Sequence, residues 1–110
     1  MEKKKDFIDS KDMFGYTPLS FACMQNQGHN SKEFRFRCIK ALVKYKASPN
    51  SFNNRTLWSP IHWLAYYGDL KSLKFLIENG AVTVIPDFEG NLPMDLAAKF
   101  NYVEVVKELI

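Results

Sequence analysis

Two proline-anchored segments repeat along this chain of 110 residues, and their spacing constrains the fold more than any other feature. Ser59-Pro60-Ile61-His62-Trp63-Leu64-Ala65 is matched by Leu92-Pro93-Met94-Asp95-Leu96-Ala97-Ala98, and the two prolines stand 33 positions apart. A third copy, Thr17-Pro18-Leu19-Ser20-Phe21-Ala22-Cys23, begins 42 positions before the second copy, so about nine residues have been inserted between them. A period of this size is typical of arrays in which one supersecondary unit is stacked several times.

The middle copy is predicted to form two helices. Ser59 can cap the first helix with its hydroxyl, and Pro60 suits the first helical position because its missing N–H is not needed there. Gly68 permits a left-handed conformation and ends this helix. Apolar residues at three- and four-residue spacing, up to Ile77, then predict a second amphipathic helix from about 69 to 79. Neither helix can bury its apolar stripe alone, so the copies are expected to stack.

All three segments resemble the T-P-L-H-x-A pattern of ankyrin repeats. The resemblance implies an all-α fold, an ankyrin-repeat solenoid of helix-turn-helix units joined by β-hairpin loops. By position, residues 1–11 resemble the end of a preceding repeat, 12–50 form repeat 1 with an inter-helix insertion at 27–34, 51–84 form repeat 2, and 85–110 form an incomplete repeat 3. Because both ends look cut from a longer array, further repeats or domains are expected in the parent protein.

Three departures between the copies carry local expectations. Leu57 falls where the family has its turn glycine, so the tip of the second hairpin is expected to be distorted. Asn101 stands where the preceding copy has its helix-ending Gly68, and asparagine enters the left-handed region more easily than most residues. The polar stretch at 27–34 is longer than the family's turn; it is either a specificity loop or a tolerated lengthening of the surface.

Composition agrees with a soluble globular domain, with 46% hydrophobic and 25% charged residues. No apolar run reaches the ~20 residues of a membrane helix, and the amino end lacks the apolar stretch of a signal peptide, so no membrane contact is expected. Cys23 and Cys38 are expected to be reduced and largely buried thiols, because two cysteines make no disulfide framework. This usage indicates an intracellular, cytoplasmic location.

The net charge of +3 is modest, but basic residues gather between positions 32 and 46. They can contact an acidic partner or form the solvated face of a helix, which is the commoner origin of such a run. No recognised nucleic-acid module is present, so nucleic acid is not expected as a partner. The basic residues are Lys32, Arg35, Arg37, Lys40, Lys44 and Lys46.

No catalytic, cofactor-binding or metal-binding constellation emerges from the sequence. It lacks a nucleophile elbow, a glycine-rich phosphate loop and histidines at metal-ligand spacing. Asp87, Glu89 and Asp95 are explained by turn chemistry and by a helix start. The resemblance gives His62 structural hydrogen bonds that tie hairpin to helix. We therefore expect no enzyme activity and no cofactor.

The resemblance implies that a protein partner binds on the concave side, through the hairpin tips and the exposed face of each first helix. Aromatic residues are frequent at these positions here, and large aromatics dominate interface hot spots. Some rings can instead fold inward between the copies, which is expected of Trp63. The partner-binding candidates are Phe14, Tyr16, Met24, Arg55, Trp58, Tyr66, Tyr67, Phe88, Lys99 and Phe100.

The function expected from these features is that of a non-catalytic protein–protein interaction module. Two alternatives stay open. The repeats can be a regulatory or substrate-recruiting segment of a larger enzyme or membrane channel. They can also form a structural subunit of a large assembly, in which the apolar ends of the array pair with neighbours.

Overall fold

The computed structural model describes residues 7–110 and contains in that range six α-helices and no strand. The first six residues of the expected segment 1–11 lie outside the described residues. The helices follow one another in three pairs: α2 (Pro18–Met24) with α3 (Ser31–Lys44), α4 (Pro60–Tyr67) with α5 (Leu70–Glu78), and α6 (Pro93–Lys99) with α7 (Val103–Leu109).

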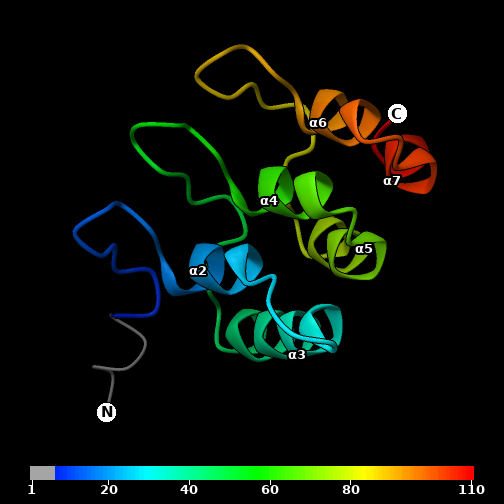
Figure 1. Cartoon of the computed structure of the whole chain (residues 1–110). Coiled ribbons are helices and arrows are strands. Elements are labelled where there is room, and N and C mark those ends of the chain that lie inside the picture. The colour runs from blue at the N-terminus through cyan, green and yellow to red at the C-terminus, as the bar shows by residue number, and fades with distance from the viewer. Residues whose placement is uncertain (1–6) are drawn as a thin grey trace.

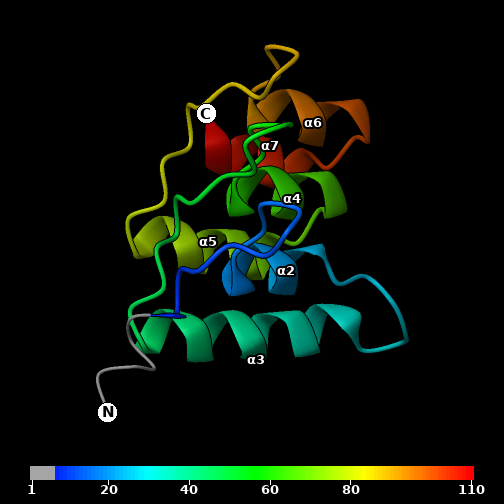
Figure 2. The ribbon, with the colours of Figure 1, turned by 90° about the vertical axis from the view of Figure 1, so that its left-hand side faces the viewer.

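The three pairs stack side by side, with the first helices in one layer and the second helices in another (Figure 1). Helix α4 packs between α2 and α6, and α5 packs against α3 and α7. The loops that precede α2, α4 and α6 all project to the same side of the stack, which faces the viewer in Figure 2. This arrangement is the predicted all-α solenoid, in which each unit contacts only its neighbours.

One continuous core runs through the three pairs, so no pair is buried by its own residues alone. Each fully buried leucine or isoleucine contributes roughly 1.5–3 kcal/mol of transfer free energy. The core consists mainly of side chains at the predicted helical spacing: Leu19, Cys23, Ile39, Ala47, Ile61, Leu64, Ala65, Leu73, Leu76, Ala97, Val105 and Leu109.

The loops before α2, α4 and α6 are hairpin-like, and a backbone hydrogen bond closes each of them. This bond spans four positions in the first and third loops, but in the second it joins the Asn53 N–H to the Trp58 carbonyl at 3.0 Å and spans five. Leu57 has φ of 60°, the left-handed conformation that Gly15 and Gly90 adopt in the other loops. The second tip therefore holds one extra residue.

Two predicted helix ends are confirmed, and Ser59 is the N-cap residue of α4, as predicted. Gly68 and Asn101 both have left-handed backbones, with φ of 69° and 62°. Thr17 caps α2, because its hydroxyl accepts from the backbone of the third helical residue at 3.2 Å. Ser59 and His62 form a capping box at the start of α4: the Ser59 hydroxyl lies 3.1 Å from Nδ1 of His62, and the same nitrogen accepts from the Ser59 N–H at 3.0 Å.

The expected insertion at 27–34 is only partly a loop. The segment between α2 and α3 covers residues 25–30, whereas residues 31–34 form the first turn of α3. Helix α3 is therefore 14 residues long and α5 is 9. The extra length extends a helix as well as a loop, as Figure 2 shows.

Two expectations about α3 are wrong. Cys38 is exposed, because it lies off the stripe of α3 that carries the buried Ile39, whereas Cys23 is buried as expected. Arg35 does not belong to a solvated basic face, because only 1% of it is exposed. It stands four residues before Ile39 and so points to the same side of the helix.

Arg35 forms a buried ion pair between the first and second helix pairs. Its Nε donates to Oδ2 of Asp69 at 2.8 Å, and the side chains of both residues are almost fully buried. Its Nη1 donates to the Gln25 carbonyl, and its guanidinium carbon lies 5.3 Å from the centre of the Tyr67 ring. Asp69 also caps α5 by accepting from the Ser72 N–H at 3.2 Å. A buried charge needs such partners, because its desolvation costs several kcal/mol.

We expect Asp69→Asn to destabilise the fold by roughly 3–5 kcal/mol in urea unfolding, because it leaves the Arg35 charge buried without a counter-ion. The asparagine keeps an oxygen that can accept from the Ser72 N–H at the cap of α5, so the loss of stability measures the effect of removing the negative charge. Adding Arg35→Met should recover part of the loss. As a control, Glu33→Gln breaks an exposed ion pair with Lys71 (3.8 Å) and should cost at most ~1 kcal/mol. Equal effects of Asp69→Asn and Glu33→Gln would contradict this role.

His62 ties the second hairpin to α4 and is fully buried. Because Nδ1 accepts from the Ser59 N–H, the ring proton of the neutral form is on Nε2. Burial lowers the pKa of His62, although the Asp87 carboxylate and the carbonyls of Ile85 and Asn91 oppose the shift. The folded protein therefore favours the neutral imidazole.

Stability should fall as the pH decreases from about 7 to about 5, because unfolded histidine binds a proton near pH 6.5 while folded His62 does so only at lower pH. At a pH between the pKa of His62 in the folded state and its pKa in the unfolded state, the unfolded protein binds more protons than the folded protein. His62→Gln supplies a non-titrating acceptor for the Ser59 N–H and should flatten the dependence of Tm on pH in this window. An unchanged slope in the variant would show that other groups cause it.

Candidate functional site

The hairpin tips form a row that hydrogen bonds hold in register. The Asn53 side-chain amide donates to the Phe14 carbonyl at 2.6 Å, which joins the first and second hairpins. The Phe88 N–H donates to the Thr56 carbonyl at 2.9 Å, which joins the second and third. Bonds on both sides of the middle tip fix the relative positions of the three tips. Fixed tips lose little entropy when a partner binds.

Arg55 stands at the middle tip between two hollows. One hollow, of about 270 Å³, is lined by residues of the first hairpin, including Asp12 and Phe14. The other, of about 340 Å³, is lined by residues of the third, including Phe88 and Glu89. Phe14 and Phe88 are 61% and 75% exposed. The row therefore presents one cation between two exposed rings, each near a carboxylate.

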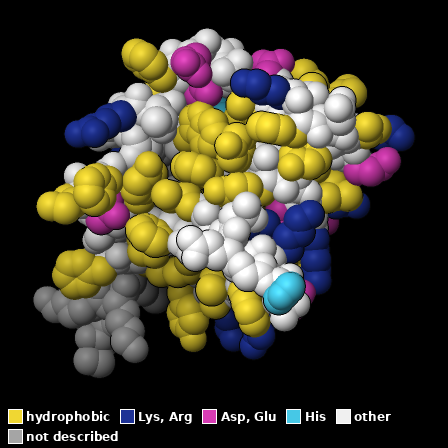
Figure 3. Space-filling model, in the orientation of Figure 1, with side chains coloured by type: hydrophobic (Ala, Val, Ile, Leu, Met, Phe, Trp, Pro, Cys, Tyr) yellow, Lys and Arg dark blue, Asp and Glu magenta, His cyan; other side chains and the backbone are white. Residues whose placement is uncertain are grey.

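A cluster of aromatic rings, which we call the aromatic cluster, continues from the hairpins onto the ends of α4 and α6. Tyr66 lies at its centre, with its ring 5.5 Å from Trp58, 5.2 Å from Tyr67 and 5.3 Å from Phe100 between centroids. All these contacts are edge-to-face, the geometry that aromatic pairs prefer. Hydrophobic side chains gather in the middle of this face of the molecule (Figure 3).

Trp63 also belongs to the aromatic cluster, although the sequence predicts only an inward position for it. Its ring is half-buried and packs against the core, which agrees with that prediction. It lies 4.6 Å from the Trp58 ring and 6.1 Å from the Tyr67 ring as well. Trp63 therefore lies between the core and the rings of Trp58 and Tyr67 and supports these rings.

A side-chain hydrogen bond holds Trp58 in place, because its Nε1 donates to Oδ2 of Asp87 at 2.8 Å. The other Asp87 oxygen accepts from the N–H groups of Glu89 and Asn91 and so shapes the third hairpin. Burial alone would raise the pKa of the Asp87 carboxyl, but the hydrogen bonds from Trp58 and from these amides hold it below its usual value. Asp87 therefore stays ionised and links the hairpin to the aromatic cluster.

Tyr67, at the edge of the aromatic cluster, and Met24 contact each other. The Tyr67 hydroxyl donates to the Met24 carbonyl at 3.2 Å, which joins α4 to the end of α2. Burial raises the pKa of Tyr67, with a smaller contribution from Tyr66. Both residues are half-buried, as is Tyr16 at the first hairpin. Their contacts hold neighbouring repeats together.

The predicted candidates therefore fall into three groups. Phe14, Arg55 and Phe88 form the row of tips, and Trp58, Tyr66, Tyr67 and Phe100 form the aromatic cluster, at the end of which Lys99 lies exposed. Tyr16 belongs to neither group, and Met24 contacts the aromatic cluster through its carbonyl, which accepts from the Tyr67 hydroxyl. The sequence assigned Asp87 to turn chemistry, which its bonds to the Glu89 and Asn91 amides confirm, but sequence reasoning missed its hydrogen bond to Trp58.

Within residues 7–110, no group of three or more His, Cys, Asp or Glu side chains could hold a metal ion. None of the helices in that range is long and apolar enough to cross a membrane. The candidate site consists of aromatic rings and charged side chains at the surface.

Comparison with known proteins places this geometry in a family. The family model for ankyrin repeats, in three copies, matches residues 2–87 and 30–110. Inversin of Canis lupus familiaris is 32% identical over 89 residues, which cover 80% of this chain and 8% of inversin. Transient receptor potential cation channel subfamily A member 1 of Homo sapiens is 29% identical over 113 residues, 100% of this chain and 9% of the channel.

A shorter relative, cyclin-dependent kinase inhibitor 2A of Homo sapiens, is 34% identical over 73 residues, 66% of this chain and 47% of the inhibitor. The chain spans less than a tenth of the length of inversin and of the channel protein. The match of the family model covers every helix of the structure. The chain therefore belongs to the ankyrin repeat family, whose repeats are non-catalytic modules that bind protein partners.

Proposed function

We propose that this chain binds a protein partner through its concave groove, which consists of the row of hairpin tips and the aromatic cluster. The observation that carries the proposal is the set of rings around Tyr66, which continues across α4 and α6 and stays accessible. Tyr66 is 37% exposed and Phe100 is 43% exposed, although both lie in contact with other rings. Monomeric proteins rarely expose contiguous apolar surface without a use for it.

The two groups supply different parts of the binding energy. Aromatic side chains near the centre of an interface contribute most, because they bury a large area with little loss of conformational entropy. The tips add orientation, since Arg55 offers its guanidinium to a carboxylate or carbonyl of the partner. The fixed spacing of the tips then limits which partners fit.

A second reading is that the repeats recruit or regulate another part of a larger protein. It is supported by the two relatives of which this chain covers less than a tenth, one of them a cation channel. In that case the groove would bind a segment of the same protein or its substrate. The free thiols Cys23 and Cys38 support an intracellular compartment for either reading.

The proposal predicts that the double variant Tyr66→Ala/Phe100→Ala loses its partners while the fold persists. Truncating a hot-spot ring weakens binding by ~2 kcal/mol or more, about 30-fold. Partners captured by the wild-type chain would be quantified against the variant by mass spectrometry. Urea unfolding of both chains would measure the cost to stability, which we expect to be small because both rings are partly exposed.

Phe34→Ala is the matched control, because Phe34 is an exposed ring on α3, away from the groove. It should retain the partners that the double variant loses. Trp58→Ala is less informative, since it also removes the hydrogen bond to Asp87 and should lower stability. Retention of every partner by a folded Tyr66→Ala/Phe100→Ala chain would rule out the aromatic cluster as the binding surface.

A further inference from the structure

The second helices α3 and α5 carry an excess of positive charge on residues that do not belong to the proposed binding groove. On α3, α5 and the residues that follow α3 there are seven exposed cations and two exposed carboxylates, Glu33 and Glu78. The rest of residues 7–110, apart from the buried Arg35–Asp69 pair, carries four cations and seven carboxylates. The seven cations are Lys32, Arg37, Lys40, Lys44, Lys46, Lys71 and Lys74.

The sequence indicates only part of this surface, because the basic run that it shows lies along a single helix. In the structure Arg35 is buried and so does not belong to the basic surface, whereas Lys71 and Lys74 of α5 lie beside α3 and do belong to it. Lys and Arg side chains gather at the lower right of Figure 3, over α3 and α5. The positive surface thus belongs to two adjacent helices, α3 and α5.

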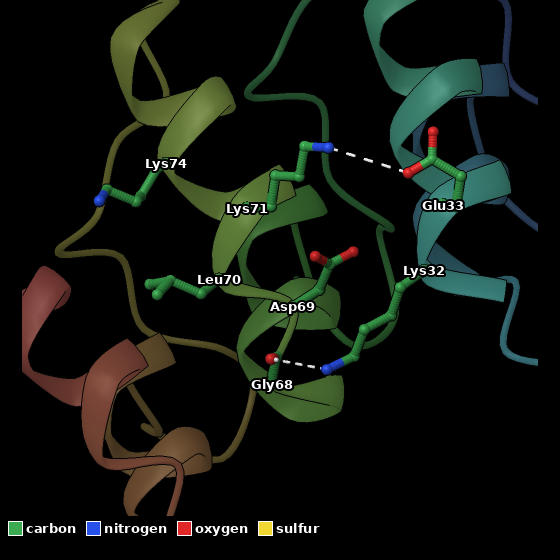
Figure 4. A pocket seen from close by; sticks show the side chains of 7 residues that line it. All are labelled: Lys32, Glu33, Gly68, Asp69, Leu70, Lys71 and Lys74. Carbon is green, nitrogen blue, oxygen red and sulfur yellow. Dashed lines mark hydrogen bonds and ion pairs between the residues drawn. The ribbon is translucent and has the colours of Figure 1, made fainter. Parts of the chain in front are cut away.

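Two separate hollows lie between α3 and α5, one toward the start and one toward the end of both helices, and we call the two hollows together the trough. The first, of about 520 Å³, is lined by Lys32, Lys71 and Lys74 together with Leu70 (Figure 4). The second, of about 530 Å³, is lined by three further lysines of α3 and its end, and by apolar residues that include Val43 and Phe75. Both hollows therefore combine lysines at the rim with apolar side chains.

An aromatic pair lies between α3 and α5, because the rings of Phe36 and Phe75 meet edge-to-face at 5.7 Å. Lys71 and Lys40 place their ammonium groups 4.3 Å and 5.5 Å from the centre of the Phe36 ring. In the first hollow Lys32 donates to the Gly68 carbonyl at 3.4 Å, and Lys71 lies 3.8 Å from Glu33 (Figure 4). These contacts hold several lysines along the trough.

We propose that the trough between α3 and α5 binds an acidic segment of a partner protein, in which Asp or Glu alternates with apolar side chains. Carboxylates of the segment would pair with the lysines, and its apolar side chains would cover Leu70, Val43 and Phe75. A phosphate backbone is polar throughout, so it would leave these apolar side chains uncovered. The trough lies on the second helices α3 and α5, whereas the aromatic cluster lies mainly on the first helices, so the two proposals concern different residues.

The test uses a fluorescent peptide of about fifteen residues with alternating Glu and Leu, and the same peptide with Gln in place of Glu. Fluorescence anisotropy should show at least tenfold tighter binding of the Glu peptide at ~50 mM NaCl, and the preference should shrink at ~300 mM because exposed charges are screened. Backbone amide NMR shifts should change along α3 and α5. Shifts confined to α4 and α6 would place the peptide in the groove and overturn the proposal.

Lys40→Glu/Lys74→Glu removes one lysine from each hollow, and both residues are exposed, so the variant should fold. We expect it to lose at least tenfold in affinity for the Glu peptide. Lys99→Glu/Lys107→Glu makes the same change in net charge on α6 and α7 and should lose less than threefold. Equal losses in the two variants would show attraction by net charge alone and would overturn the proposal.

Two further outcomes would also overturn it. Tighter binding of a single-stranded oligonucleotide than of the Glu peptide at the same salt concentration would identify a nucleic-acid surface. A concentration-dependent dimer that Lys40→Glu/Lys74→Glu dissolves would identify a second copy of this chain as the occupant. Loss of partners in Tyr66→Ala/Phe100→Ala bears only on the groove, so the two proposals fail separately.

Discussion

The buried ion pair between Arg35 and Asp69 is the interaction on which the arrangement of the first two helix pairs depends. It links the second helix of one pair to the start of the second helix of the next, and it also reaches the Gln25 carbonyl and the Tyr67 ring. A charge taken out of water is tolerated only with such a set of partners. The same pair therefore fixes the loop before α3, the edge of the groove and the width of the trough.

The two faces of the stack differ because stacking uses only part of each helix surface. The small and branched residues of the core, such as Ala65 and Leu73, are buried between neighbouring helix pairs. The side chains that remain exposed on α4 and at the end of α6 include aromatic rings, and those on α3 and α5 include most of the lysines. In a repeat protein these leftover surfaces are the part that can vary without loss of the fold.

The helices were predictable from sequence because their determinants are local. Proline at the first position and Gly68 at the end marked α4, and apolar residues at three- and four-residue spacing gave α5 as 69–79, against Leu70–Glu78 in the structure. The burial of Arg35 and the bond between Trp58 and Asp87 were not predictable in this way, because each joins residues about thirty positions apart. Pattern reasoning assigned an arginine to the surface, and only its distant partner makes burial possible.

Hydrogen bonding divides the aromatic residues of the groove more sharply than exposure does. Trp58 and Tyr67 have their polar groups engaged with Asp87 and the Met24 carbonyl, so they support the fold and the shape of the groove. Tyr66 and Phe100 contribute mainly ring contacts and keep more of their surface free. The rings with engaged polar groups hold the freer rings in fixed positions, which lowers the entropy lost on binding. If the aromatic cluster binds a partner as proposed, its affinity would depend on a smaller set of residues than the aromatic pattern of the sequence indicates.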